Sequence, residues 1–229
     1  MNNVLRILAW MLAILLMTAA ANADALTEGL VQAEPLKGTC GRSDAAHQAS
    51  FSLAYSYPQF ENADSINRYY QALAGQLSAD FLTGDTTITC DVTHHSARYV
   101  SVLETTASMG GNGETQTLRA DTFALDGIYA GQRISLTQLL GLEEQAGVAK
   151  SLAYRLVWEI VENGMQNPDS DYLDGLTAQQ VQSAFDPEWD YYLDQDGNIV
   201  FWIGAGEIAG EIAGVLMFPF AEAELLSAI

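Results

Sequence analysis

The chain has 229 residues, of which 49% are apolar and 17% are charged, so it can bury a full core, and the disordered, collagen-like and low-complexity classes are excluded. Its 29 Asp and Glu residues outnumber its 9 Lys and Arg residues, which gives a formal net charge of −20. Such a surface repels phosphate groups, so we expect no nucleic-acid partner, whereas its field attracts a cationic protein.

The first 23 residues have the layout of a secretory signal peptide. Arg6 is followed by an apolar run from Ile7 to Met17, and the segment ends in the small-residue triplet Ala21-Asn22-Ala23. Cleavage after this triplet leaves a mature chain that starts at Asp24 and has no membrane span. The alternative is an uncleaved anchor, because Val4–Ala21 carries no charge except Arg6. In both cases we expect the remainder to be exported, either secreted or held at the cell surface or in the periplasm.

The mature chain is expected to begin with a leader or linker over residues 24–48, where Ala, Glu, Gly and Pro are mixed without a period. The folded domain then covers residues 49–229. A further division of this domain into residues 49–109 and 110–229 is compatible with the pattern of predicted elements.

Strand and helix patterns start soon after residue 48. Phe51–Tyr57 alternates apolar with small or polar residues, which predicts a half-buried strand that Pro58 ends. Asp64 or Ser65 can cap a helix that is closed by Gly84. The apolar stripe of this helix consists of Ile66, Tyr70, Leu73, Leu77 and Phe81. Two more strands are expected, at Ile88–Val92 and Arg98–Met109.

Glycines separate the elements in the middle of the chain. Gly110-Gly111-Asn112-Gly113 predicts a hairpin connection to an extended segment over Thr115–Asp126. Ser135 has the position of an N-cap for a short helix that ends at Gly141. The clearest helix of the chain opens with two acidic residues at its positive end and stops at a glycine. Its first residues are Glu143 and Glu144, its stripe is Ala149, Leu152, Leu156 and Ile160, and its end is Gly164.

The last part of the chain predicts a weaker helix and three strands. The helix covers Ala178–Phe185, and strands at Glu188–Leu193 and Asn198–Ile203 flank the turn Asp196-Gly197. A final strand at Val215–Phe220 precedes a short helix. The apolar stretch from residue 199 to residue 220 is not a second membrane span, because Glu207 and Glu211 would each cost about 3 kcal/mol at the bilayer centre. Strands and helices occur in blocks, so we expect an α+β fold with a mainly antiparallel sheet and two to four helices.

Two cysteines, Cys40 and Cys90, lie in the exported part of the chain. An oxidising compartment would let them pair, and we therefore expect one disulfide. It would close a loop of about 50 residues and stabilise the fold by up to about 4 kcal/mol. The alternative is two unpaired, buried thiols.

No metal or other cofactor is expected. His47, His94 and His95 are the only histidines, and neighbouring strand residues point to opposite faces of a sheet. Calcium has two weak candidate segments, which lack the spacing and the terminal glutamate of an EF-hand and are better explained as an acidic loop and a hairpin turn. These segments contain Asp169, Asp171, Asp174 and Gly175, and Asp194, Asp196, Gly197 and Asn198.

Several motifs, taken in their order and spacing, are similar to a known domain. They are Tyr57-Pro58-Gln59-Phe60 with Ile66-Asn67, Phe123-Ala124-Leu125-Asp126-Gly127 with Gly131-Gln132-Arg133-Ile134-Ser135-Leu136 and Leu139-Leu140, Tyr191-Tyr192-Leu193 through Phe201, and Ile208-Ala209, Gly214 and Phe218-Pro219-Phe220 with Glu224-Leu225. Over residues 49–229 they resemble the RsiV-type extracellular domain. That domain of unknown function occurs on lysozyme-sensing anti-sigma factors and beside the catalytic domain of PdaC-type peptidoglycan deacetylases.

The resemblance implies a lysozyme-like partner or a location at the cell wall, but this chain departs from the family in two places. Many members carry Gly-Gly-Ala-His where this chain has Gly110-Gly111-Asn112-Gly113, so any role of that histidine is absent. Only five residues precede Arg6, so we expect a free-standing exported version without a sigma-binding segment.

The sequence contains no catalytic motif, neither a Gly-x-Ser-x-Gly elbow nor a His-Glu-x-x-His pair. We therefore expect a non-catalytic binding or sensor-type domain that engages a basic protein such as lysozyme. The alternative is a carboxylate-dependent cell-wall or glycan hydrolase, although nothing singles out two of the 29 acids. A sugar-stacking platform is a further option for four aromatic residues, which at strand spacing fill the core more often. They are Trp189, Tyr191, Tyr192 and Trp202.

Overall fold

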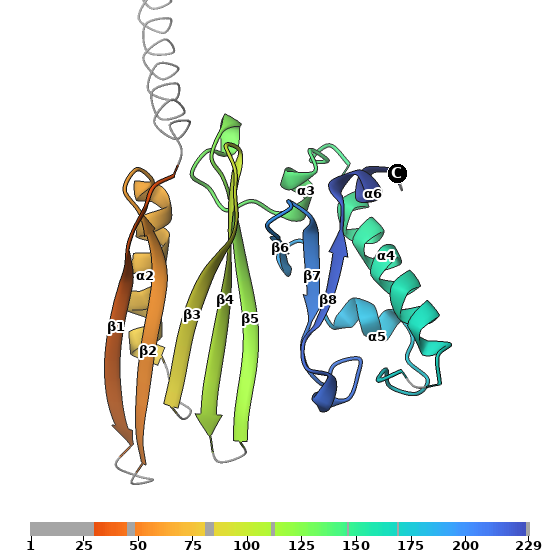
Figure 1. The fold of residues 1–229 in the computed structure, drawn as a ribbon, viewed down its shortest axis with the longest axis horizontal. Helices are drawn as coiled ribbons and strands as arrows, with labels where there is room; N and C mark the ends of the chain where they lie inside the picture. The colour runs from red at the N-terminus through yellow and green to blue at the C-terminus, as the bar shows by residue number, and fades with distance from the viewer. Residues whose placement is uncertain are drawn as a thin grey trace, which may run out of the picture.

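The computed structural model describes residues 30–44, 49–80, 85–110, 113–145, 147–168 and 170–227. It confirms the α+β fold expected from the sequence. Within these ranges the strands form a five-stranded sheet in the order β1-β2-β3-β4-β5 and a three-stranded sheet in the order β6-β7-β8 (Figure 1). The signal peptide and His47 lie outside the described residues. None of the helices in the described ranges is long and apolar enough to cross a membrane.

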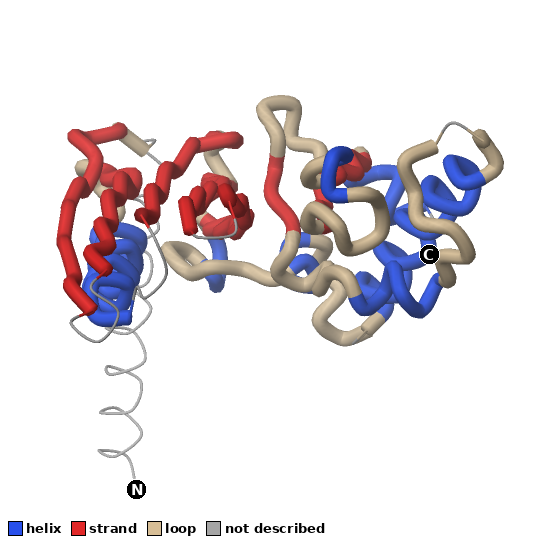
Figure 2. The backbone as a smooth tube through the Cα atoms, turned by 90° about the horizontal axis from the view of Figure 1, so that it is seen from below, coloured by secondary structure: helices blue, strands red, loops and turns tan. Residues whose placement is uncertain are grey.

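The N-terminal half of the molecule is the five-stranded sheet with one helix. Its strands are β1 (Gln32–Asp44), β2 (Ala49–Phe60), β3 (Asp85–His95), β4 (Tyr99–Gly110) and β5 (Gly113–Ala124). All neighbours are antiparallel except β2 and β3, which are parallel because helix α2 (Asp64–Asp80) connects them. The helix lies on one face of the sheet, and the opposite face of its lower part is open (Figures 1 and 2).

The described part of the expected apolar stripe, Ile66, Tyr70, Leu73 and Leu77, packs on this sheet, and Phe81 lies outside the described residues. Ile66 and Tyr70 are completely buried, together with Tyr57 of β2 and Phe123 of β5. The ring of Tyr70 stacks on that of Tyr57 with 5.3 Å between centroids and meets Phe123 edge-on at 6.0 Å. These aromatic contacts join α2 to both sides of the sheet.

Strand β1 was not expected, because its residues fall in the segment assigned to a leader. It pairs with β2 along its length and contributes the side chains of Leu36 and Cys40 to the edge of the core. The register shifts between Ala33 and Leu36, so that two residues of β1, including Pro35, lie opposite Pro58 of β2. A bulge in an edge strand such as β1 tolerates proline. Because the bulge lies opposite Pro58, no regular pairing is lost there, and β2 continues past Pro58 to Phe60.

The C-terminal half follows β5. It contains η1 (Gly127–Tyr129), α3 (Leu136–Leu139), α4 (Val148–Met165), α5 (Ala178–Ser183), β6 (Tyr191–Leu193), β7 (Ile199–Ile203), η2 (Glu211–Ala213), β8 (Leu216–Phe220) and α6 (Glu222–Ser227). The expected cap of α3 is confirmed, because the Ser135 hydroxyl accepts from Gln138 N and the Gln138 side chain accepts from Ser135 N. The sheet β6-β7-β8 and helix α4 share one core (Figure 1).

Helix α4 starts later than predicted, and its predicted stripe is confirmed for Ala149 and Leu152 but not for Ile160. It begins after Gly147, whose φ of +83° breaks the helix, so Glu143 and Glu144 belong to the preceding turn. Its buried face includes Ala149, Ala153, Val157 and Val161, which follow one another at intervals of four residues. Ile160 was expected on the buried stripe but is 41% exposed, because the next residue, Val161, is the one that belongs to the buried series.

Hydrogen bonds join the two halves. Leu193 N of β6 donates to the buried Ser101 Oγ of β4 at 3.0 Å, and His94 Nδ1 of β3 lies 2.9 Å from Asp194 O. The division between the halves falls after Ala124, not between residues 109 and 110, because β5 pairs with β4 from Gly113 to Ala124 and belongs to the first sheet.

Candidate binding surface

The expected disulfide is not formed, and both cysteines are free thiols. Cys40 pairs with Leu53 across β1 and β2, whereas Cys90 pairs with Glu104 across β3 and β4. Strand β2 therefore lies between the two cysteines. Two strand spacings of about 4.8 Å already exceed the span of about 7 Å that a disulfide bridges between Cα atoms. The sequence could not exclude the pair because it does not reveal which strands are neighbours.

The two described histidines have separate environments, as expected from their adjacent positions. His94 Nδ1 lies 2.9 Å from Asp194 O, which only accepts, so this nitrogen carries the proton and ties β3 to the β6–β7 hairpin. His95 is exposed. Among the described residues, no three His, Cys, Asp or Glu side chains are grouped so that they could hold a metal ion.

The Asp194 side chain stabilises the turn of its own hairpin. Its Oδ1 accepts from Asp196 N and Asn198 N at 2.9 Å each, and its Oδ2 accepts from Asn198 Nδ2 at 2.9 Å. Partial burial would raise the pKa of Asp194, but these hydrogen bonds outweigh it and lower the pKa. The geometry is that of a turn stabilised by an aspartate. Of the other acidic segment, Asp169 lies outside the described residues, and Asp171 and Asp174 are exposed.

The four aromatic residues considered as a sugar platform do not converge. Tyr191 is buried in the C-terminal core, and Trp202 of β7 is covered, with the ring of Tyr192 at 6.3 Å. Trp189 is partly exposed, and the Arg133 guanidinium lies 4.5 Å from its ring centroid. Their separation leaves no flat aromatic face.

A polar cluster is buried between α2 and the sheet. The Asp121 carboxylate accepts from Tyr69 Oη at 2.7 Å and from Arg119 Nη2 at 2.8 Å, and it pairs with Arg133 Nε at 2.7 Å. Arg119 also donates to Tyr69 Oη. Glu104 is the cross-strand partner of Arg119, and its Oε2 lies 3.8 Å from Arg119 Nη1.

Burial raises the pKa of Glu104, which is a property of catalytic acids. This carboxyl group, however, has a side chain only 9% exposed, and Asp121 beside it is 2% exposed. Both carboxyl groups belong to the packing of α2 on the sheet, where a substrate would have to displace the helix. The cluster therefore does not favour the hydrolase alternative.

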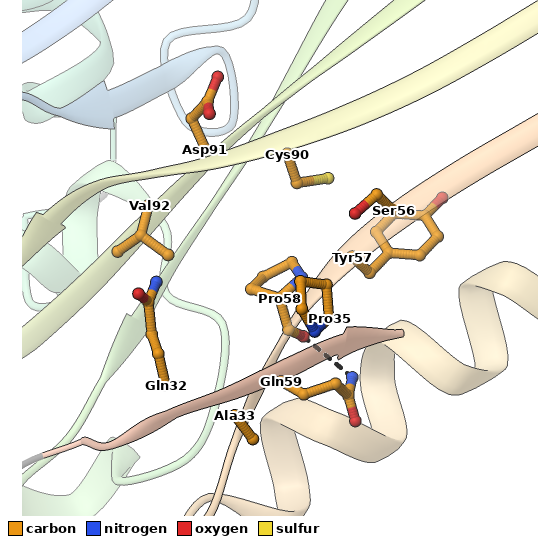
Figure 3. Close-up of a pocket in the computed structure, with 10 residues that line it drawn as sticks. All are labelled: Gln32, Ala33, Pro35, Ser56, Tyr57, Pro58, Gln59, Cys90, Asp91 and Val92. Carbon is orange, nitrogen blue, oxygen red and sulfur yellow. Dashed lines mark hydrogen bonds between the residues drawn. The ribbon is translucent and has the colours of Figure 1, made fainter. Parts of the chain in front are cut away.

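A pocket of about 300 Å³ opens where β2 and β3 diverge beyond their three paired residues (Figure 3). Cys90 and Asp91 of β3 and Ser56 of β2 line it. Burial raises the pKa of Cys90, so its thiol is a poor nucleophile at neutral pH. The Asp91 carboxylate points away from the Cys90 thiol in Figure 3, so the two do not form a reactive pair.

Charge is distributed very unequally along the chain. Arg155 is the last Lys or Arg, and the residues after it include fourteen Asp and Glu. The nearest cations are already paired, because Lys150 Nζ lies 2.8 Å from Asp186 Oδ1 and Arg155 Nε lies 3.9 Å from Glu159 Oε1. The C-terminal half therefore carries most of the uncompensated negative charge.

The β7–β8 connection contains two consecutive Gly-Glu-Ile-Ala tetrapeptides, Gly206–Ala209 and Gly210–Ala213. Ile208 of the first is completely buried, whereas Ile212 of the second has a relative exposure of 103%. Glu207 and Glu211, which precede the two isoleucines, are both exposed. The loop thus exposes one isoleucine, Ile212, together with two carboxylates, one of which directly precedes it.

Hydrogen bonds hold this loop against residues 171–173. Leu173 N donates to Ile208 O at 3.0 Å, and Gly210 N donates to Asp171 O at 3.1 Å. Leu173 is itself 44% exposed between Asp171 and Asp174. We refer to residues 171–174 and 206–213 together as the acidic tip. It lies at the opposite end of the C-terminal half from α3 (Figure 1).

The acidic tip was not predicted as a unit. The tandem tetrapeptide was a signal that could have found it, because a repeated motif with one isoleucine too many for the core predicts an exposed copy. The pairing with residues 171–173 could not be read from the sequence.

The sequence matches no protein-family model and no curated protein. Its fold is similar to that of two solved structures. One is a DUF3298 family protein from Pseudomonas aeruginosa PAO1, with a TM-score of 0.52 and 13% identity, over 88% of this chain and 94% of that one. The other is a member of the DUF3298 family from Bacteroides fragilis NCTC 9343, with a TM-score of 0.51 and 11% identity, over 87% of this chain and 98% of that one. At these identities the likeness concerns the fold.

Proposed function

We propose that this chain is an exported, non-catalytic binding module that engages a cationic protein, such as lysozyme, through its acidic tip. The observation that carries the proposal is Ile212, a fully exposed isoleucine directly after the exposed Glu211, in a loop that also exposes Glu207. The resemblance to the RsiV-type domain suggests the class of partner. The fold shared with solved DUF3298 structures is compatible with this role but is not evidence for a ligand.

Two physical effects favour binding at the tip. The charge of the C-terminal half attracts a basic protein over several ångströms and raises its rate of association. Once the surfaces meet, Ile212 and Leu173 supply apolar area that is lost from water, which contributes about 25 cal/mol for each Å² buried. Charge alone would bind many cations weakly, so the apolar residues provide the affinity.

The tip is also held in place before it binds. Ile208 anchors the loop in the core, and the backbone of residues 171–173 pairs with it. An ordered loop loses little conformational entropy when it docks, so more of the contact energy appears as affinity.

The test is to measure the association of the purified protein with hen lysozyme by calorimetry at ionic strengths of about 0.01 and 0.15 M, between which screening of surface charges increases strongly. We expect binding that weakens with salt. Ile212→Ser should lower the affinity by at least about tenfold, as for a buried interface anchor. Glu207→Gln with Glu211→Gln should lower it and flatten the dependence on salt.

The matched control is Glu143→Gln with Glu144→Gln. It removes the same number of charges from an exposed turn outside the tip, so the contribution of Ile212 to the affinity for lysozyme should stay unchanged. Absence of binding to lysozyme and to other basic proteins at low salt would contradict the proposal, as would binding that the tip variants do not change. Turnover of peptidoglycan or chitooligomers by the purified protein would contradict the non-catalytic role.

A further inference from the structure

The open face of the five-stranded sheet carries a groove of about 460 Å³ across β1, β2 and β3. Its lining forms a block of three residues from each strand, in the register Lys37 with Ser56, Gly38 with Tyr55 and Thr39 with Ala54, continued on β3 by Thr87, Ile88 and Thr89. Tyr55 and Ile88 direct their side chains to the α2 face, where they pack with the core. The outward residues therefore define the groove.

The floor of the groove is made by small side chains. Ala54 and Ser56 of the central strand lie between the longer side chains of β1 and β3. Because side chains alternate along a strand, these two residues face the same way and leave a trough along β2. A single branched apolar side chain fits such a trough without moving the backbone.

The charge of the groove is unusual for this molecule. Its lining includes Lys37 and no Asp or Glu, in a chain with 29 acids and 9 bases. A groove with a cation at its rim and an uncharged floor suits an apolar side chain with a carboxylate beside it. The acidic tip has this chemistry, because the exposed Ile212 directly follows the exposed Glu211 and Glu207 is exposed in the same loop.

We propose that the acidic tip of one copy docks into the β1–β2–β3 groove of a second copy. In this contact Ile212 covers Ala54 and Ser56, and Lys37 faces Glu211 or Glu207. The tip and the groove lie on different halves of the chain, so the contact is head-to-tail and leaves a free tip at one end of the pair and a free groove at the other. The inference goes beyond the proposed function, and it makes a cationic partner and a second copy competitors for the same tip.

The salt dependence of self-association separates it from partner binding. Two copies with a net charge of −20 each repel one another over a distance that salt shortens. Self-association should therefore strengthen as ionic strength rises, whereas binding of a cationic protein should weaken.

Sedimentation velocity of the purified protein over a range of concentrations tests the contact. We expect oligomers that grow with concentration and salt, and that Ile212→Ser, Lys37→Glu or Ala54→Phe each reduces at least about tenfold in association constant. Ala54→Phe fills the groove but leaves the tip intact, so this variant should still bind lysozyme. Its behaviour distinguishes failure of the groove from failure of the proposed function.

Mixing two variants gives the decisive result. Ile212→Ser keeps its groove and Ala54→Phe keeps its tip, so each alone should be monomeric, and an equimolar mixture should give a one-to-one complex that grows no further. A protein that stays monomeric at all concentrations would overturn the inference. So would oligomers that the three variants do not weaken, or a mixture of the two variants that forms no complex.

Discussion

Ile208 and Ile212 occupy equivalent positions in two identical tetrapeptides, yet the first is completely buried and the second is completely exposed. The difference arises from backbone pairing, because residues 208–210 bond to residues 171–173 and bring the first isoleucine into the core. No segment among the described residues covers the second isoleucine in this way. The pair offers a stability comparison in which the local sequence is constant.

Ile208→Ala should destabilise the protein by about 2–5 kcal/mol, the range for removing a large apolar side chain from a core. Ile212→Ala should change the free energy of unfolding by less than about 0.5 kcal/mol, because an exposed side chain loses little on truncation. Urea unfolding of the two variants measures both values. Equal losses of unfolding free energy in the two variants would contradict the burial of Ile208 and the exposure of Ile212.

Asp121 holds three donors in the buried cluster, so its substitution should be severe. Asp121→Asn leaves Arg119 and Arg133 without their shared carboxylate and should cost about 3–5 kcal/mol, as for a broken buried ion pair. Tyr69→Phe removes the hydrogen bond that Tyr69 Oη donates to Asp121 and the one that it accepts from Arg119, and should cost about 1–3 kcal/mol. Thermal unfolding of both variants checks the order, and a larger loss for Tyr69→Phe would contradict the central role of Asp121.

Glu104 should make stability depend on pH. Burial raises its pKa above the ordinary value of 4.5, so the folded chain holds the proton more tightly than the unfolded chain. As pH rises from the pKa of Glu104 in the unfolded chain to its pKa in the folded chain, the contribution of this group to the free energy of unfolding falls. Above the folded pKa the lost stability is not regained.

Glu104→Gln cannot ionise and should gain stability relative to the original protein as pH rises from 4 to 7. Urea unfolding at several pH values measures the difference. Glu143→Gln is the control, because an exposed substitution should change stability by less than about 0.5 kcal/mol at each pH. A difference between Glu104→Gln and the original protein that stays constant with pH would contradict the assignment.

Both cysteines should react as free thiols. In denaturant each should take up one alkylating group without prior reduction, and the intact mass should not change on adding a reductant. In the folded protein Cys90 should react slowly, because burial raises its pKa and lowers its thiolate fraction. Mass spectrometry of non-reduced peptides provides the measurement, and a peptide that joins residues 40 and 90 would contradict the strand order.

Locally encoded features were predicted well from the sequence. The hydroxyl and amide of Ser135 and Gln138 form a reciprocal cap within four residues, and the Asp196-Gly197 turn depends on Asp194 next to it. The stripe that begins with Ile66 and Tyr70 also met the core as expected. In these cases the partners lie close in the sequence, so the pattern contains the interaction.

Features that depend on distant partners were missed. Strand β1 contains Pro35, Gly38 and Gly41, which indicate a loop when read alone. In the fold a side chain at Gly38 would place its Cβ 2.2 Å from Tyr55 Oη, so this glycine makes room for the ring of the neighbouring strand. Pro35 is accommodated by the bulge opposite Pro58. Neither requirement can be seen without knowing which strand is adjacent.

The candidate site was predicted only as a property of the whole chain. Acidity and an attraction for basic proteins followed from composition, but the position of the tip depends on pairing between residues 171–173 and the β7–β8 loop. The disulfide prediction failed for the same reason, because spacing in sequence does not report that β2 separates Cys40 from Cys90.

The absence of Lys and Arg from residues 156–229 has a consequence for resistance to proteolysis. Proteases of the trypsin type cleave after basic residues, because an aspartate in their specificity pocket selects a cationic side chain. Exposed loop tips are the usual places where such enzymes cut. From Leu156 onward this sequence offers them no cleavage site, and the glycine-rich loop that displays Ile212 falls within that stretch. The loop that carries the fully exposed Ile212 is therefore resistant to this whole class of digestion.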